Sequence, residues 1–170
     1  MEKKRNMFSG KVIAVSHHDV VLPNGQTCEL EVVEHPGGAA IVAVDTQQRV
    51  CLLRQYRYVT SAWIWELPAG KLEPNEAPQI TAQRELAEEA GVTAQRWSDL
   101  GVIWSSPGVF CEKIYLYLAR DLDSVATDHE LHENIEVHWV PLVEAVKWAR
   151  EGKISDAKTI VGLFRAAQLI

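Results

Sequence analysis

The stretch RELAEEAGV at residues 84–92 limits the fold of this chain more than any other segment, because it gathers three glutamates on one short helix. The helix is predicted over residues 77–90, with Pro78 tolerated in its first turn and Gly91 ending it. At about 100° per residue, the three carboxylates fall within an arc of about 100°, beside an apolar stripe that should be buried. The three glutamates are Glu85, Glu88 and Glu89.

Carboxylates this close together need a positive partner, and two interpretations are open. In the first, the helix face is solvated and Arg84 pairs with Glu88 one turn further on. In the second, one or more divalent cations hold the carboxylates together, since a single arginine cannot serve all three. Glu85 and Glu89 are one turn apart, so their repulsion would cost an isolated helix about 0.2–0.5 kcal/mol without such a partner.

The composition is that of an ordinary soluble domain and excludes several classes of protein. The 170 residues, 47% hydrophobic and 24% charged, suffice for one domain with a sizeable core. The net charge of −6 argues against a nucleic-acid-binding surface. Three cysteines without C-x-x-C spacing predict neither a disulfide framework nor a zinc site, and favour a reducing cytoplasm. No apolar run is long enough for export or a membrane span, so we expect no membrane partner.

Strand-like segments dominate the chain on both sides of the predicted helix. A hairpin is predicted over residues 11–36 around the Asn-Gly pair of LPNGQ, and a second one over residues 37–58 across DTQQR. Residues 59–78 are predicted to be a loop, because prolines and glycine interrupt them. The later strands are predicted within 100–104, 112–120 and 135–140, and the closing helices within 142–153 and 155–170, with Ser155 as N-cap of the last. This order predicts an α/β layered domain.

The residues upstream of the helix change the balance between the two interpretations. From Gly70 to Val92 the chain reads Gly-x5-Glu-x7-Arg-Glu-U-x-Glu-Glu-x-Gly-U, where U is aliphatic. This string resembles the signature of the Nudix hydrolases, with every defining position filled. The resemblance implies an α/β/α sandwich with a mixed sheet, a metal site in a loop-helix-loop, and hydrolysis of nucleoside diphosphates linked to another group.

The resemblance also implies a role for each position of the motif. Mg²⁺, or Mn²⁺ in its place, would be held by the three glutamates and the backbone carbonyl of Ala69. Glu76 and Arg84 would pair and brace the loop against the helix, while Gly70 and Gly91 would be structural. The implied chemistry is sound, because Mg²⁺ prefers oxygen ligands, neutralises diphosphate charge and lowers the pKa of a bound water.

Three further segments resemble the ADP-ribose and nucleoside diphosphate sugar pyrophosphatase branch of this family. Pro107 stands sixteen positions beyond Gly91, where that branch places a proline. The segments LLRQYRYVTSAWIWELPAGKLEPNE and EGKISDAKTIVGLFRA follow the branch's pattern, so that the resemblance runs from about residue 10 to the end. It implies cleavage of ADP-ribose to AMP and ribose 5-phosphate, or of a related nucleoside diphosphate sugar to a nucleoside monophosphate and a sugar phosphate.

Substrate contacts are expected from the strand and loop before the motif. Arg57, in the Gln-Tyr-Arg pattern, is the arginine expected on the diphosphate, since an arginine fork suits phosphate oxygens. Arg54 lies on the opposite side of the same strand and is the alternative. Glu66 is expected to pair with a nucleobase edge or with an arginine, and Pro107 to border the substrate. Trp63 and Trp65 are interpreted as core or dimer-contact residues, Trp65 as core.

The catalytic base is predicted from the acidic loop TDHELHEN, residues 127–134. The resemblance points to Glu133, with Glu130 as the rival, but two histidines and a leucine interrupt the family's usual run of acids there. Glu88 is the third candidate, as the motif glutamate least needed for the tightest metal contacts. Glu136 falls in the following strand and is expected to be structural.

The resemblance implies a homodimer as well. Residues 1–38 read as an amino-terminal strand arm, poorly stable alone and able to pack across a two-fold axis, before a hydrolase domain at 39–170. Two other functions stay open. One is hydrolysis of another nucleotide, such as a nucleoside triphosphate, a dinucleoside polyphosphate or NADH, although the chain lacks a zinc-ribbon cysteine pattern. The other is a non-catalytic ligand sensor, although the motif is complete.

Overall fold

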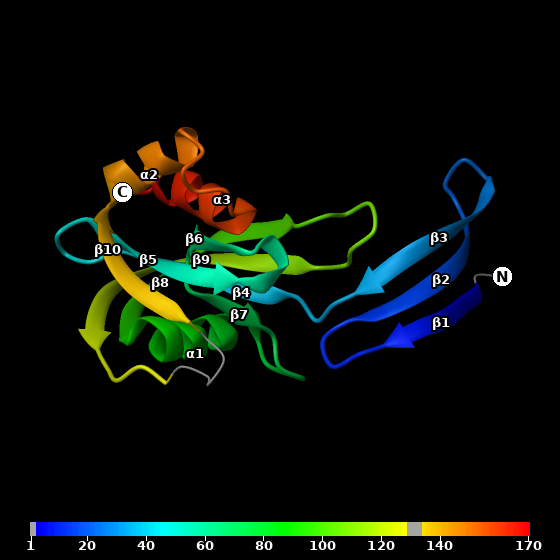
Figure 1. The fold of residues 1–170 in the computed structure, drawn as a ribbon, viewed down its shortest axis with the longest axis horizontal. Coiled ribbons are helices and arrows are strands. Elements are labelled where there is room, and N and C mark those ends of the chain that lie inside the picture. Colours follow the sequence, from blue (N-terminus) through cyan, green and yellow to red (C-terminus); the bar gives the residue numbers. More distant parts are fainter. Residues whose placement is uncertain (1–2, 129–133) are drawn as a thin grey trace.

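An antiparallel sheet of three strands projects away from the rest of the chain and forms an arm (residues 3–34; Figure 1). The computed structural model describes residues 3–128 and 134–170. The arm consists of β1 (Lys3–Ser9), β2 (Ala14–Val21) and β3 (Thr27–Glu34), in that order. The hairpin predicted around the Asn-Gly pair is confirmed, because β2 and β3 pair across a turn in which Gly25 has φ 83°. The arm meets the body where the backbone of Val33 bonds Val109 and Cys111.

The body contains two sheets, with strand orders β10-β5-β6 and β7-β4-β9-β8. Among the strands of the described residues in these two sheets, β4 and β9 pair in parallel and the other neighbours are antiparallel. The strands are β4 (Gly38–Ala43), β5 (Arg49–Arg57), β6 (Ala62–Glu66), β7 (Ala69–Lys71), β8 (Val92–Trp104), β9 (Lys113–Ser124) and β10 (Ile135–Pro141), with a 3₁₀ turn at Tyr58–Thr60.

Helices cover both sides of these sheets, so the predicted α/β/α layering is confirmed (Figure 1). The helix α1 (Pro78–Ala90) lies on one side, and α2 (Leu142–Arg150) and α3 (Ala157–Ala166) lie on the other. Every residue of β4 is buried, because alternate side chains enter two different cores. Ala40 and Val42 pack with α2 and α3, whereas Ile41 and Ala43 pack with α1.

Three predictions about local structure were wrong. Residues 37–58 do not form a hairpin, because β4 pairs with β7 and β9 while β5 pairs with β6 and β10, leaving one bridge between Val44 and Val50. The segment 59–78 is not all loop, since it contains β6 and β7 on either side of Pro68. The last helix is capped by Asp156 rather than Ser155, and its side chain accepts hydrogen bonds from the amide and hydroxyl of Thr159.

The predicted motif helix and the later elements lie close to the expected positions. The helix α1 begins at Pro78 and ends before Gly91, which has φ 65° as a left-handed C-cap. The strands β8 and β9 are longer than predicted, and β9 continues to Ser124. Within the described residues, none of the helices has the length and apolar content needed to cross a membrane.

Candidate functional site

Five carboxylates gather around a hollow of about 260 Å³ beside α1, which we call the carboxylate pocket. Its acidic lining residues are Glu73, Glu85, Glu88, Glu89 and Asp128, and its basic ones are Arg57, Lys71 and Arg84. Glu85 and Glu89 are largely buried, with 12% and 4% exposure, whereas Glu88 is more exposed. With five acidic and three basic side chains, the lining carries an excess of two negative charges.

Arg84 ties the loop before α1 to the helix itself. Its Nε and Nη2 donate to the two oxygens of Glu76 at 3.1 Å each, and Nη2 also donates to the Lys71 carbonyl at 3.3 Å. Nη1 donates to Glu85 Oε1 at 2.8 Å and to Glu88 Oε2 at 3.0 Å. Hydrogen bonds from Arg84 and then Thr81 lower the pKa of Glu76 to about 2, so this carboxylate is charged at neutral pH.

The chain between β6 and α1 approaches α1 closely at two points. The Ala69 amide donates to Glu89 Oε2 at 2.8 Å, which fixes one buried carboxylate against the backbone. At Gly70, an added Cβ would overlap the carboxylate of Glu85. The absence of a side chain at residue 70 therefore leaves the room that Glu85 occupies.

Arg57 stands at the edge of the carboxylate pocket, paired with Glu66. Its Nε donates to Glu66 Oε1 at 2.6 Å and its Nη2 to Glu66 Oε2 at 2.8 Å. Of the two partners predicted for Glu66, the arginine is the one found, and Lys158 is a second cation on the same carboxylate. The side chain of Arg57 remains 42% exposed. A paired but accessible guanidinium can still meet an anion in the pocket.

Two larger hollows meet at Arg57. One, of about 540 Å³, has apolar and aromatic walls that include Trp104, Ile114 and Val161. The other, of about 530 Å³, lies under the turn between β5 and β6. Because Arg57 lines both of them and the carboxylate pocket, a ligand with two halves joined by an anionic group could place that group at Arg57.

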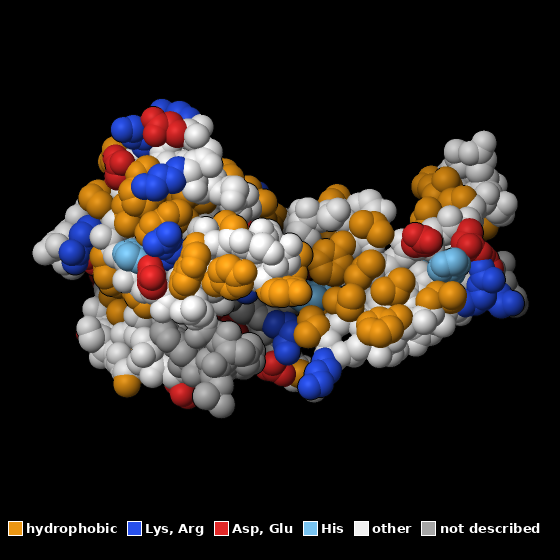
Figure 2. Space-filling model, viewed as in Figure 1, with side chains coloured by type: hydrophobic (Ala, Val, Ile, Leu, Met, Phe, Trp, Pro, Cys, Tyr) orange, Lys and Arg blue, Asp and Glu red, His pale blue; other side chains and the backbone are white. Residues whose placement is uncertain are grey.

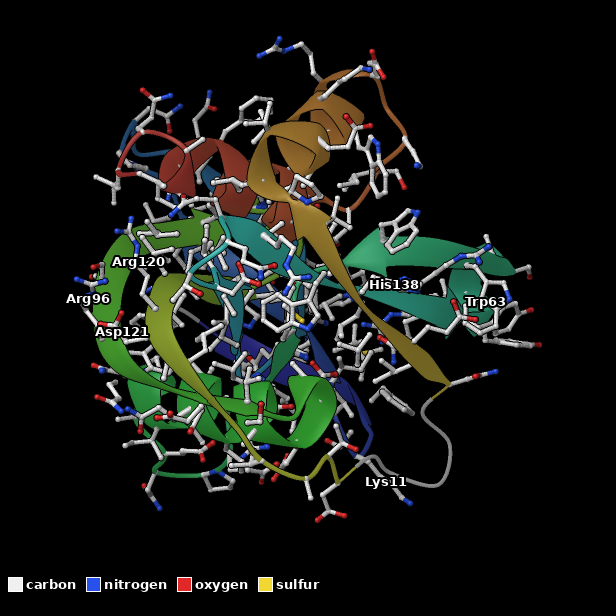
Figure 3. All side chains as sticks on the ribbon, turned by 90° about the vertical axis from the view of Figure 1, so that its left-hand side faces the viewer. Lys11, Trp63, Arg96, Arg120, Asp121 and His138 are labelled. Carbon is white, nitrogen blue, oxygen red and sulfur yellow. The ribbon has the colours of Figure 1, made fainter. Side chains whose placement is uncertain are left out.

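The remaining predicted substrate residues lie elsewhere. Arg54 lines none of these three hollows, and its guanidinium lies over the rings of Trp63 and Trp65 and 3.7 Å from Glu136. Trp63 is part-exposed on the hairpin that projects from the body (Figure 3). Trp65 packs against the core, as predicted. Pro107 lines a separate hollow between β3 and the 104–111 loop.

The predicted bases fall into two groups. Glu133 and Glu130 lie outside the described residues. Glu88 lies in the carboxylate pocket and bonds Arg84. Glu136 is in β10, as expected, and faces Arg54 and His138.

Three charged residues join the site without a sequence pattern that would identify them. Asp128 lines the carboxylate pocket, and its amide bonds the carbonyl of Glu88 at 2.9 Å, but nothing in the sequence prefers it over the other acids of its loop. Asp156 and Lys158 come from the start of α3 and line the two larger hollows. The one available signal is a lysine in the first turn of a helix, where a positive charge is unfavourable.

The donor set of the carboxylate pocket fits a hard divalent cation. Carboxylate oxygens with an excess of negative charge are the ligands that Mg²⁺ and Mn²⁺ take. In the ranges 3–128 and 134–170, no three His, Cys, Asp or Glu side chains already stand in a metal-binding arrangement. Arg84 and the Ala69 amide contact oxygens of Glu85, Glu88 and Glu89. A cation would take over part of the role of Arg84.

Comparison with known proteins agrees with this geometry. The family model described as NUDIX domain matches residues 34–161. The ADP-ribose pyrophosphatase of Bacillus subtilis is 40% identical over 158 residues, covering 92% of this chain and 85% of the relative. The methanol dehydrogenase activator of Bacillus methanolicus is 38% identical, covering 95% and 88%. A solved structure titled as an ADP compounds hydrolase shares the fold, with a TM-score of 0.83 at 21% identity over 98% of this chain and 91% of that one.

Proposed function

The chain belongs to the NUDIX domain family, and from this premise we propose that it hydrolyses the diphosphate bond of ADP-ribose or of a related nucleoside diphosphate sugar. ADP-ribose gives AMP and ribose 5-phosphate. The observation that carries the proposal is the carboxylate pocket, which opens beside an accessible arginine at the meeting point of two larger hollows. The B. subtilis relative, named ADP-ribose pyrophosphatase, supports the choice of substrate.

The residues of the carboxylate pocket have different roles in this reaction. Glu85, Glu88, Glu89 and the Ala69 carbonyl would hold Mg²⁺, for which Mn²⁺ could substitute. Such an ion, when bound, would supply neutralisation of the diphosphate charge and activation of a water. Arg57 binds the diphosphate oxygens, with its orientation fixed by Glu66. The proton of the attacking water goes to a glutamate, for which Glu133, Glu130 and Glu88 are the candidates.

A substrate panel tests this proposal. With Mg²⁺ present, we expect ADP-ribose to be cleaved to AMP and ribose 5-phosphate, faster than nucleoside triphosphates, dinucleoside polyphosphates or NADH are cleaved. A coupled phosphatase releases phosphate from the exposed monophosphates, and chelation of the metal should abolish the signal. If another compound of the panel is cleaved faster than ADP-ribose, that compound is the preferred substrate. No cleavage of any member, with Mg²⁺ or Mn²⁺, would favour the ligand sensor.

A second candidate function follows from the 38% identical relative whose name describes an activator of methanol dehydrogenase. In this candidate, the chain acts on a dehydrogenase. The test is whether the rate of a dehydrogenase rises when this chain is added. If the Glu89→Gln variant loses both this stimulation and hydrolysis, stimulation depends on hydrolysis.

We also propose a homodimer formed through the arm. A sheet of three strands needs a covered hydrophobic face to be stable, and in the arm every residue of β1 is exposed. The arm exposes large apolar side chains, some of which are visible along it in Figure 2. The exposed large apolar residues on the arm are Met7, Phe8, Val12, Val21 and Leu30. Sedimentation at micromolar concentration should therefore give twice the 19.1 kDa chain mass, and a monomer would contradict the proposal.

The cysteines are consistent with a cytoplasmic location, which we likewise propose. Cys28, Cys51 and Cys111 are all free thiols. A reducing compartment preserves such thiols.

A further inference from the structure

Lys158 occupies a position that the stability of its own helix does not explain. It lies in the first turn of α3, where the helix dipole disfavours a positive charge. Asp156 already caps this helix by accepting from the Thr159 amide at 3.0 Å. The lysine side chain is only 14% exposed, and lysines are seldom buried unless they are paired. The reason for a lysine here must lie in what it contacts.

Its contacts join α3 to the arginine of the candidate site. Lys158 Nζ donates to Glu66 Oε2 at 2.6 Å and to Asp156 Oδ1 at 3.0 Å. Glu66 Oε2 is also the acceptor for Arg57 Nη2 at 2.8 Å, so one carboxylate oxygen receives two cations. Asp156 is fixed in turn by Thr159, whose hydroxyl accepts from the Leu67 amide at 2.8 Å. The chain of bonds is therefore anchored to the backbone of the body.

The charges of this cluster cancel only when the lysine is present. Arg57 and Lys158 balance Glu66 and Asp156, and without the lysine a net negative charge would remain beside the pocket. Burial raises the pKa of Glu66, but the hydrogen bonds and charges of Arg57 and Lys158 outweigh burial and lower this pKa to about 2. Glu66, with 3% exposure, is thus a permanent buried anion that needs both cations.

We propose that Lys158 is a positioning residue for diphosphate binding. By donating from α3 to the Glu66 oxygen that Arg57 also contacts, it keeps the Arg57 guanidinium in place and offsets the negative charge that would otherwise draw Arg57 away from the substrate. The inference rests on the proposed contact of Arg57 with the diphosphate. It predicts that Lys158 acts on substrate affinity through Arg57, with little effect on the chemical step.

A double-mutant cycle tests this coupling. Lys158→Met is expected to raise KM for ADP-ribose about tenfold while kcat stays within about twofold. In an Arg57→Ala background, Lys158→Met should change kcat/KM by less than about twofold, because the residue it positions is absent. Lys158→Arg, which keeps the charge, should remain within about threefold of the wild type. Lys147→Met removes an exposed lysine of α2 and is the matched control.

A binding measurement separates this inference from the choice of substrate. Inorganic pyrophosphate with Mg²⁺ should bind Lys158→Met about tenfold more weakly than the wild type by calorimetry. If the wild type cleaves no substrate, the proposed function fails, but the pyrophosphate affinities still decide the role of Lys158. Unchanged KM and pyrophosphate affinity in a folded Lys158→Met variant would overturn the inference, as would equal losses with and without Arg57. If Lys158→Met does not fold, Lys158→Gln is judged by the same criteria.

Discussion

Glu89→Gln is expected to reduce kcat/KM for ADP-ribose by about 100-fold or more while the protein stays folded. Glu89 is buried against the backbone at the bottom of the carboxylate pocket, where its Oε2 accepts from the Ala69 amide. Glutamine has nearly the same shape, and its amide oxygen can still accept that bond. The substitution therefore removes the negative charge offered to a metal and leaves most of the packing unchanged.

Three measurements distinguish weaker metal binding from a loss of folding in this variant. Steady-state rates should fall, the Mg²⁺ concentration for half-maximal rate should rise, and Tm should move by less than about 5 °C. Glu151→Gln removes a carboxylate from the exposed end of α2 and should behave like the wild type in all three. Near-normal hydrolysis by a folded Glu89→Gln variant would show that the metal site has been assigned to the wrong carboxylates.

Gly70→Ala is the second substitution with a large expected effect, although it adds only one methyl group. The new Cβ would overlap the Glu85 carboxylate, so the glutamate must swing away or β7 must move off α1. Overpacking of this kind costs about 1–3 kcal/mol of stability, and the displaced Glu85 should lower kcat/KM at least about tenfold. Thermal unfolding and steady-state kinetics would measure the two losses separately.

Gly108→Ala is the matched control for stability. An added Cβ at Gly108 meets no atom within 4 Å, so its Tm should equal that of the wild type. A Gly70→Ala variant with wild-type Tm and kcat/KM would mean that Glu85 can leave its position at no cost. Glu85 would then be an unimportant ligand, and the close approach at residue 70 would have no role in the reaction.

The motif helix and its surroundings could be predicted because their signals are local. Pro78 and Gly91 limit α1, and the spacing of the glutamates along it follows from helix geometry alone. The family resemblance then supplied the α/β/α layering. Strand partners could not be predicted in the same way, because β4 and residues 50–53 of β5 are both short continuous apolar runs. The sequence of such a run does not indicate which strand pairs with it.

The residues that orient Arg57 could not be predicted from the sequence either. The sequence offered a nucleobase edge or an arginine as the partner of Glu66, and it gave no sign that Lys158 reaches Glu66 from α3. Lys158 lies 92 positions from Glu66, and no periodicity connects residues so far apart. Contacts of this kind depend on the tertiary fold, so a sequence motif identifies the metal-binding carboxylates more readily than the residues that orient the arginine.

The strand β4 also determines how the body unfolds. Five of its residues, 39–43, supply side chains alternately to the two cores, so the two layers share a single backbone segment. Heat cannot melt the side covered by α1 and leave the side covered by α2 and α3 intact, because the loss of β4 opens both. The body is therefore one cooperative unit of unfolding, whereas the arm, which contains no part of β4, can open independently.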